Sequence, residues 1–189
     1  MPDKYVVVVD TNTLLQSLLN DTGPAGKCLG YFRRGEIDIV VSRDTLNEAR
    51  EVLSRSPLRI RYPQLTDEKV AHLINFLLYR GTYLRNVQRW FEYPRDPRDE
   101  PFLNLAIEVE ADYLISRDPD LLDLMKWDQE EGRAFQRRFR FLKIVTPVEF
   151  LKAMENRESQ NYYESALFVI KHFFGRASCR LEGSDLDCG

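Results

Sequence analysis

The sequence has few of the residues that build disulfide frameworks and zinc sites. Its 189 residues include 3 cysteines and 2 histidines. Cys28, Cys179 and Cys188 are odd in number and lack the spacing of metal ligands. His72 and His172 each lie within a helical pattern. These scarcities argue against a disulfide scaffold, a zinc site and histidine-based catalysis.

Long apolar runs are also missing. No run approaches the length that spans a bilayer, and no apolar segment at the N-terminus resembles a secretory signal. Together with the low cysteine content, this predicts a reduced, cytoplasmic protein that makes no use of a membrane. The sequence shows neither internal repeats nor low-complexity segments.

An excess of positive charge is missing too. The chain has 27 Lys and Arg against 30 Asp and Glu, for a formal net charge of -3. Nucleic-acid-binding proteins tend to be basic, so contact with a phosphate backbone would need a local basic patch or a metal ion. The hydrophobic fraction of 43% suffices for one well-buried domain plus an appendage.

One stretch near the N-terminus organises the rest of the chain. Four valines at 6–9 suit a strand that is buried on both faces, as in the centre of a parallel sheet. The run stops at Asp10 and is followed by a helical apolar pattern over 14–19. Ligands of open α/β sheets bind at the carboxyl ends of such strands. The alternative is that Asp10 only caps the next helix.

Strand and helix patterns alternate along the chain. This alternation predicts a three-layer α/β/α sandwich with a central parallel sheet, plus a C-terminal helical extension. We expect a main domain over 1–155, followed by a helix and a weakly structured tail over 156–189. Strands are expected at 6–9, 37–41, 83–87, 113–116 and 142–146, and helices at 14–19, 24–34, 43–54, 66–81, 102–111, 121–124, 147–154 and 162–174.

Four acidic residues should converge at one edge of this sheet. Asp10 and Asp118 follow strands, and helical geometry turns Glu48 and Asp99 toward apolar faces. Each has a simpler explanation: Asp99 and Asp118 could only cap helices, and Glu48 could pair with an arginine. Crowded carboxylates repel one another, so a shared pocket needs a cation. Oxygen ligands without His or Cys select Mg²⁺ or Mn²⁺, ions that promote phosphodiester hydrolysis.

Five short motifs then occur in order over residues 4–154. They are Val9-Asp10-Thr11-Asn12, Ser42 with Leu46 and Glu48, Asp96-Pro97-x-Asp99 leading into Phe102-Leu103-x-Leu105-Ala106, Ala111-Asp112-Tyr113-Leu114-Ile115-Ser116-Arg117-Asp118-x-Asp120-Leu121-Leu122, and Val145-Thr146-Pro147-x-Glu149-Phe150-Leu151. Together they resemble the PIN-domain family, most closely its group of toxins from toxin–antitoxin pairs.

The resemblance implies a Mg²⁺- or Mn²⁺-dependent endoribonuclease that has RNA as substrate and an antitoxin protein as partner. The alternatives are a cellular RNA-processing nuclease without an antitoxin, and a PIN-fold binding module with weak catalysis. By motif, the catalytic metal ligands are Asp10, Glu48, Asp99 and Asp118, with Asp96 and Asp120 as further ligands and with Asn12 and Ser116 orienting the acids.

Two segments depart from the family pattern. In the first, over 133–141, arginines alternate with aromatic residues, which suits RNA binding. The alternative is an amphipathic helix whose Phe residues pack inside and whose arginines are solvated. The second extends beyond residue 156 and would be a helix docked on its own domain, or else a surface for a homodimer or partner. The arginines of the first segment are Arg133, Arg137, Arg138 and Arg140.

Overall fold

The central feature is a sheet of five parallel strands. The computed structural model describes residues 4–174, and the side chains of 4–160, 162 and 163. The strands lie in the order β3-β2-β1-β4-β5, with every neighbouring pair parallel. Their bounds are β1 (Tyr5–Val9), β2 (Ile37–Ser42), β3 (Thr82–Leu84), β4 (Tyr113–Ile115) and β5 (Lys143–Val145).

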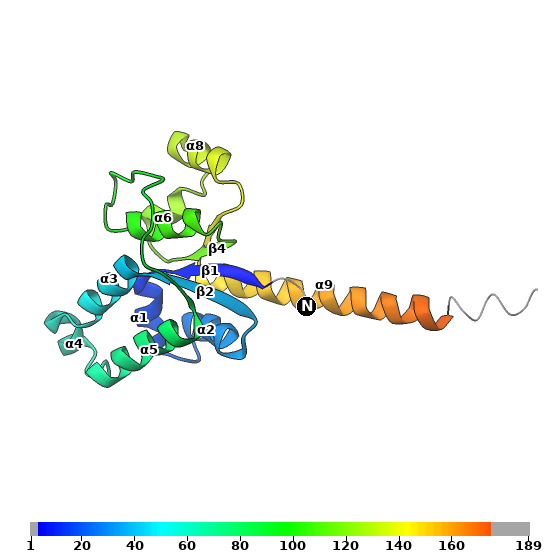
Figure 1. Ribbon diagram of the computed structural model, residues 1–189, viewed down its shortest axis with the longest axis horizontal. Helices are drawn as coiled ribbons and strands as arrows, with labels where there is room; N and C mark the ends of the chain where they lie inside the picture. Colours follow the sequence, from blue (N-terminus) through cyan, green and yellow to red (C-terminus); the bar gives the residue numbers. More distant parts are fainter. Residues whose placement is uncertain (1–3, 175–189) are drawn as a thin grey trace, which may run out of the picture. The chain divides into compact units, whose positions relative to one another are not determined.

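Helices cover both faces of the sheet (Figure 1). In the view of Figure 1, α6 and α8 lie on one side of the sheet, and α1, α2 and α5 lie on the other. This arrangement confirms the predicted three-layer fold. The helices are α1 (Thr11–Leu19), α2 (Pro24–Arg34), α3 (Arg43–Leu53), α4 (Ser56–Arg61), α5 (Asp67–Arg80), α6 (Glu100–Glu108), α7 (Pro119–Asp123), α8 (Glu130–Arg138) and α9 (Pro147–Phe174).

The valine run behaves as predicted because β1 is the central strand. Val7, Val8 and Val9 are all buried. The register aligns Val8 with Leu114 and Ile144, so one row of apolar side chains crosses the sheet. That row belongs to a cluster with α6 and α8 residues such as Leu103 and Phe135. This core fixes the sheet against the helices that carry the candidate site.

Helix α6 ends earlier than expected, and helix α4 was not expected. The apolar pattern predicts a helix to residue 111, yet α6 ends at Glu108. The chain reverses at Glu110, whose φ of 47° lies in the left-handed region, and Ala111 N–H donates to the Ala106 carbonyl at 2.8 Å. The sequence patterns do not predict α4, because its six residues carry no apolar periodicity and none is buried.

The C-terminal helix is longer than expected. The sequence predicts separate helices over 147–154 and 162–174, but α9 is continuous from Pro147 to Phe174. No proline or glycine interrupts the stretch between them, so nothing in its local chemistry ends the helix. The chain divides into two compact units, Met1–Leu151 and Lys152–Gly189. The expected tail, with Cys179 and Cys188, lies outside the described residues.

The remaining expectations about the chain's chemistry concern cysteine and membranes. Cys28 is a free, buried thiol. Within residues 4–174, none of the helices combines the length and the apolar character needed to cross a bilayer.

Candidate active site

A cavity of about 560 Å³ opens where β1, β2 and β4 end. The chain passes from β1 to β2 and β3 on one side, then returns to add β4 on the other side of β1. Such a switch in strand order leaves a crevice at the carboxyl ends of the strands. The lining residues are Asp10, Thr11, Asn12, Asp44, Asn47, Glu48, Glu51, Val52, Arg55, Asp96, Arg98, Asp99, Pro101, Phe102 and Asp118.

Asp10 caps a helix and also lines this cavity. Its Oδ1 accepts a hydrogen bond from Thr13 N–H at 2.6 Å, as the capping alternative proposed. Its Oδ2 accepts one from the Ser116 hydroxyl, which sits at the end of the neighbouring strand β4. Asp10 is only 4% exposed. Both oxygens are therefore held by neighbours, which fixes the carboxylate at the floor of the cavity.

Asp99 occupies the N-cap position of α6, but its side chain makes no capping hydrogen bond. Capping therefore does not account for this acid. Its Oδ2 is buried and has no hydrogen-bond partner among the described residues. Buried polar atoms without a partner are rare and costly in proteins, so this oxygen is available to a ligand in the cavity.

Glu48 reaches the cavity from α3. Ser42 ends β2 and caps this helix through a hydrogen bond from Thr45 N–H at 3.2 Å, so the strand end sets the direction of the helix. The side chain of Glu48 is partly buried on the cavity wall. The ion pairs found within the described part of the chain do not include Glu48. The arginine pairing considered for it is therefore not observed.

The remaining sequence-derived candidates divide into two groups. Asp118, Asp96 and Asn12 line the cavity with the three acids above, and Asp118 also caps α7 through Asp120 N–H at 2.9 Å. Asp120 is not among the lining residues; its carboxylate pairs with Arg95 at 2.6 Å. Ser116, which was expected to orient the acids, is fully buried and donates a hydrogen bond to Asp10.

Burial and mutual repulsion raise the pKa values of these acids. Burial raises the pKa of Asp99 to about 8, with the charges of Asp118 and Asp96 adding to the effect. Burial raises the pKa of Glu48 to about 7, and the charge of Asp10 contributes. Burial also raises the pKa of Asp10. Three acids in one cavity thus favour a neutral form or a compensating cation.

The acids of the cavity are not placed at the distances that metal coordination needs. With the side chains as they are placed, no group of three or more His, Cys, Asp or Glu among the described side chains (4–160, 162 and 163) is set to hold a metal ion. The chemistry of the donors nevertheless suits a hard cation, because carboxylate oxygens dominate the lining and one of them, Asp99 Oδ2, lacks a partner.

Two arginines also line the cavity. Arg55 is paired with Glu51 at 2.8 Å, one turn away on the same segment. Arg98 is exposed and belongs to no ion pair within the described residues, although acids precede and follow it at 96 and 99. Its backbone is held by a hydrogen bond from its N–H to Asp96 Oδ1 at 2.9 Å. Arg98 therefore offers a free cation at the mouth of an acidic cavity.

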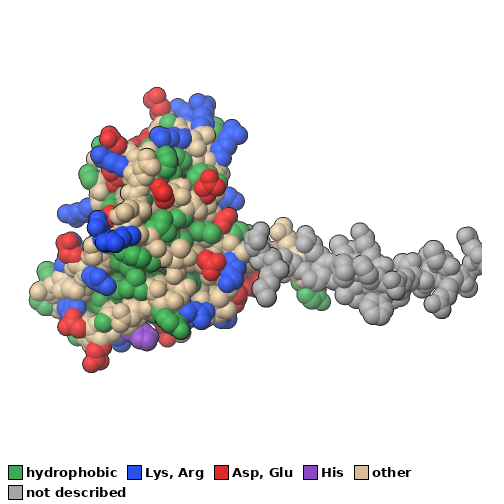
Figure 2. Space-filling model, in the orientation of Figure 1, with side chains coloured by type: hydrophobic (Ala, Val, Ile, Leu, Met, Phe, Trp, Pro, Cys, Tyr) green, Lys and Arg blue, Asp and Glu red, His purple; other side chains and the backbone are tan. Residues whose placement is uncertain are grey.

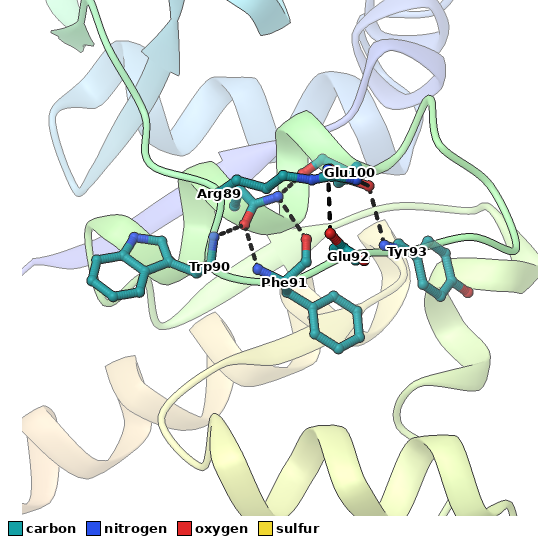
Figure 3. Close-up of polar contacts among 7 residues, drawn as sticks. Arg89, Trp90, Phe91, Glu92, Tyr93 and Glu100 are labelled. Atoms are coloured by element: carbon teal, nitrogen blue, oxygen red, sulfur yellow. Dashed lines mark hydrogen bonds and ion pairs between the residues drawn. The ribbon is translucent and has the colours of Figure 1, made fainter.

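A buried asparagine that the sequence patterns did not single out ties α6, the helix that follows Asp99, to the segment over 89–93. Asn104 Oδ1 accepts hydrogen bonds from Trp90 N–H at 2.6 Å and Phe91 N–H at 2.8 Å, and its Nδ2 donates to the Phe91 carbonyl at 2.9 Å. Figure 3 shows the segment over 89–93 and labels Glu100, the α6 residue to which it is also joined.

Glu100 and Arg95 make further contacts of this kind. Glu100 Oε2 accepts from Tyr93 N–H at 3.1 Å and pairs with Arg89 (Figure 3). Arg95 pairs with both Asp120 and Asp123, which joins the turn to α7. A polar residue inside the apolar run 102–107 was the available sequence signal for Asn104. The sequence held no comparable sign of what Arg95 contacts.

Comparison with known families agrees with this geometry. A PIN-domain family model matches residues 6–120, which include all four candidate catalytic acids. The chain belongs to the PIN-domain family. The PIN domain is a nuclease-type fold that commonly depends on metal ions. No curated protein matches the chain.

The pKa of Asp99 leads to a prediction about stability. Its folded value of about 8 lies above the ordinary 3.8, so the metal-free protein should lose stability as the pH rises from about 4 to about 8. Asp99→Asn removes that loss. In EDTA, we expect the variant to melt above the wild type at pH 8 and close to it at pH 5, measured by calorimetry.

The matched control is Asp128→Asn, because Asp128 is an exposed acid outside the cavity. Its melting temperature should follow that of the wild type at both pH values. A difference between Asp99→Asn and the wild type that is the same at pH 5 and pH 8 would contradict the electrostatic explanation.

Proposed function

We propose that this protein is a metal-dependent endoribonuclease that hydrolyses RNA phosphodiester bonds. One observation carries the proposal: acids that are distant in sequence line a single cavity at the switch point of the sheet, and their charges are not offset there by an equal number of cations. The lining contains seven carboxylates (Asp10, Asp44, Glu48, Glu51, Asp96, Asp99 and Asp118) and two arginines (Arg55 and Arg98).

Asp10, Glu48, Asp99 and Asp118 would hold the ion, with Asp96 as a further ligand. Mg²⁺ or Mn²⁺ bound there would offset the carboxylates, polarise the phosphate and activate water for attack on phosphorus. Asp120 is a weaker candidate ligand, since its carboxylate pairs with Arg95. Because the acids are not yet at chelating spacing, ion binding would require some of the side chains on the cavity wall to rotate.

The chain's own residues have separate tasks in this proposal. Ser116 and Thr13 hold Asp10 in one orientation, so that it needs little reorganisation when a ligand binds. The turn over 96–99 is closed by hydrogen bonds from Asp99 N–H to the Asp96 carbonyl and from Arg98 N–H to Asp96 Oδ1, and it presents Asp99 and Arg98 together. Arg98 would hold a phosphate of the substrate next to the scissile bond, because it is the lining cation that has no acidic partner among the side chains that the structure describes.

One observation favours a second function. Within the described part of the chain, no three metal-binding side chains are set to hold an ion. That spacing is what a PIN-fold binding module with weak metal affinity would also have. Metal titration by calorimetry separates the two functions: a nuclease should bind Mg²⁺ or Mn²⁺, and Asp99→Asn should weaken that binding, whereas a binding module should show little heat in either protein.

Cleavage assays provide the direct test. Structured and unstructured RNAs incubated with the purified protein should be cut in Mg²⁺ or Mn²⁺ and left intact in EDTA. Asp10→Asn and Asp99→Asn should each reduce the rate by more than about 100-fold, because loss of even the outer partners of metal ligands costs about 10- to 100-fold. Asp128→Asn serves as the control and should cut like the wild type. Cleavage that persists in EDTA or in both site variants would refute the assignment.

Arg98→Gln tests the role of the free arginine. We expect the KM for RNA to rise by about tenfold, since a hydrogen bond to a charged group contributes about 1.5–3 kcal/mol, while the affinity for Mn²⁺ stays equal or increases. Arg50→Gln is the matched control, because Arg50 is an exposed arginine on α3 that does not line the cavity. An unchanged KM, or a loss of Mn²⁺ binding, would contradict this role.

The resemblance to the toxin group further supports a role as the toxin of a toxin–antitoxin pair. Induced expression should then arrest growth, Asp10→Asn should abolish the arrest, and co-expression of a short neighbouring gene should relieve it. Active RNA cleavage without any growth arrest would instead favour a cellular RNA-processing nuclease that has no antitoxin.

A further inference from the structure

A strongly basic segment lies outside the cavity. Residues 133–143 include five basic residues and no acidic ones, in a protein whose formal net charge is -3. Figure 2 shows Lys and Arg side chains gathered over α8, at the top of the view. The basic residues of this segment are Arg133, Arg137, Arg138, Arg140 and Lys143.

The contacts of these arginines divide them into two kinds. Arg133 donates to the backbone carbonyls of Trp127 and Asp128 at 3.2 and 3.1 Å, so it holds the loop before α8 in place. Arg138 donates to the Trp90 carbonyl at 2.9 Å. Both therefore have structural partners. Arg137 and Arg140 have no ion pair and donate no side-chain hydrogen bond within the described residues.

The free arginines lie around a hollow of about 300 Å³ between α8 and β5. Trp127 is 56% exposed at its edge, and the Arg137 guanidinium lies 5.9 Å from the centre of the Trp127 ring. The hollow therefore combines an exposed aromatic ring with uncompensated positive charge. Its lining residues are Met125, Trp127, Gln136, Arg137, Phe139, Arg140, Leu142 and Lys143.

Packed aromatic side chains lie beneath this hollow. Phe135 and Phe139 are buried, and their rings pack against each other with centres 5.1 Å apart. Gln136 Nε2 donates to the Leu124 carbonyl at 3.1 Å. Phe135 and Phe139 thus face inward while Arg137 and Arg140 are exposed, but Phe141 at the end of the segment is 39% exposed. The packed helix fixes the backbone that carries Arg137, so ligand binding does not have to order that part of the chain.

We propose that this hollow binds single-stranded RNA, with one base stacked on Trp127 and the flanking phosphates held by Arg137, Arg140 and Lys143. The inference rests on the proposed function in one respect, which is that RNA is the substrate. It adds a second binding surface for the RNA chain outside the catalytic cavity. Exposed aromatic rings beside arginines are the usual means of holding single strands without reading their sequence.

Charge alone would also attract an acidic protein segment. Two features favour RNA instead. Trp127 offers a ring to stack on, and the guanidinium near it can lie against a base as well as contact a phosphate. The lining has few aliphatic side chains with which to bind the apolar residues of a protein partner. An acidic peptide therefore serves as the competing ligand in the test.

The experiment measures binding without catalysis. A fluorescein-labelled single-stranded RNA is titrated with the full-length protein in EDTA, and anisotropy is recorded at several salt concentrations. The double variant Arg137→Gln/Arg140→Gln should weaken binding roughly tenfold and reduce the salt slope by about 0.7 for each phosphate that is no longer neutralised. Trp127→Ala should weaken binding roughly fivefold or more while leaving the salt slope unchanged.

The matched control is the double variant Arg61→Gln/Arg85→Gln, which removes the same charge from exposed positions outside both cavities. It should bind like the wild type. Circular dichroism melting of each variant separates a loss of binding from a loss of folding. Because the chain has 2 tryptophans, Trp90→Phe leaves Trp127 as the only one, and RNA should then quench its fluorescence.

Three outcomes would overturn the inference. The first is that Arg137→Gln/Arg140→Gln and Trp127→Ala bind RNA as tightly as the wild type. The second is equal weakening by the control variant, and the third is binding of polyglutamate as tightly as RNA of the same charge. The nuclease proposal is tested separately by cleavage in Mg²⁺. RNA that binds through Trp127 without being cut would refute that proposal and leave this inference intact.

Discussion

The fold has to overcome the repulsion between carboxylates that it brings into one cavity. Burial and neighbouring charges raise the pKa values of Asp99 and Glu48, so these acids lower stability when they are ionised without a cation. A protein keeps such a site only if the rest of the fold is stable enough to hold it. The central strand β1 supplies that stability, since Val7, Val8 and Val9 are buried between two layers of helices.

The acids of the cavity differ in how many hydrogen bonds hold their carboxylates. Asp10 is held at both oxygens by Thr13 and Ser116, whereas Asp99 Oδ2 has no hydrogen-bond partner in the described part of the chain. Hydrogen bonds from Asp99 N–H to the Asp96 carbonyl and from Arg98 N–H to Asp96 Oδ1 hold the backbone of this turn, but the Asp99 carboxylate stays unengaged. One acid is thus a rigid reference point and another is free to respond to a ligand, which is a useful division of roles in a site that binds an ion.

Sequence patterns were most informative where local chemistry decides the structure. The valine run, the cap at Ser42 and the acids after the strands identified the sheet, its three layers and the cavity that contains Asp10, Glu48 and Asp99. They were least informative at the ends of helices. The end of α6 at Glu108 and the continuity of α9 followed from backbone geometry that periodicity does not encode.

By itself, the sequence determined which acids face inward and which strand ends bring them together, because side-chain periodicity and parallel pairing are local rules. Only the tertiary structure decided which of them are free. Asp120 is engaged by Arg95, and Arg133 and Arg138 hold backbone carbonyls, while Asp99, Arg98 and Arg137 have no acidic or basic partner within the described chain. The physical reason is that an ion pair or hydrogen bond depends on distances between residues far apart in sequence, and only the packed fold sets those distances.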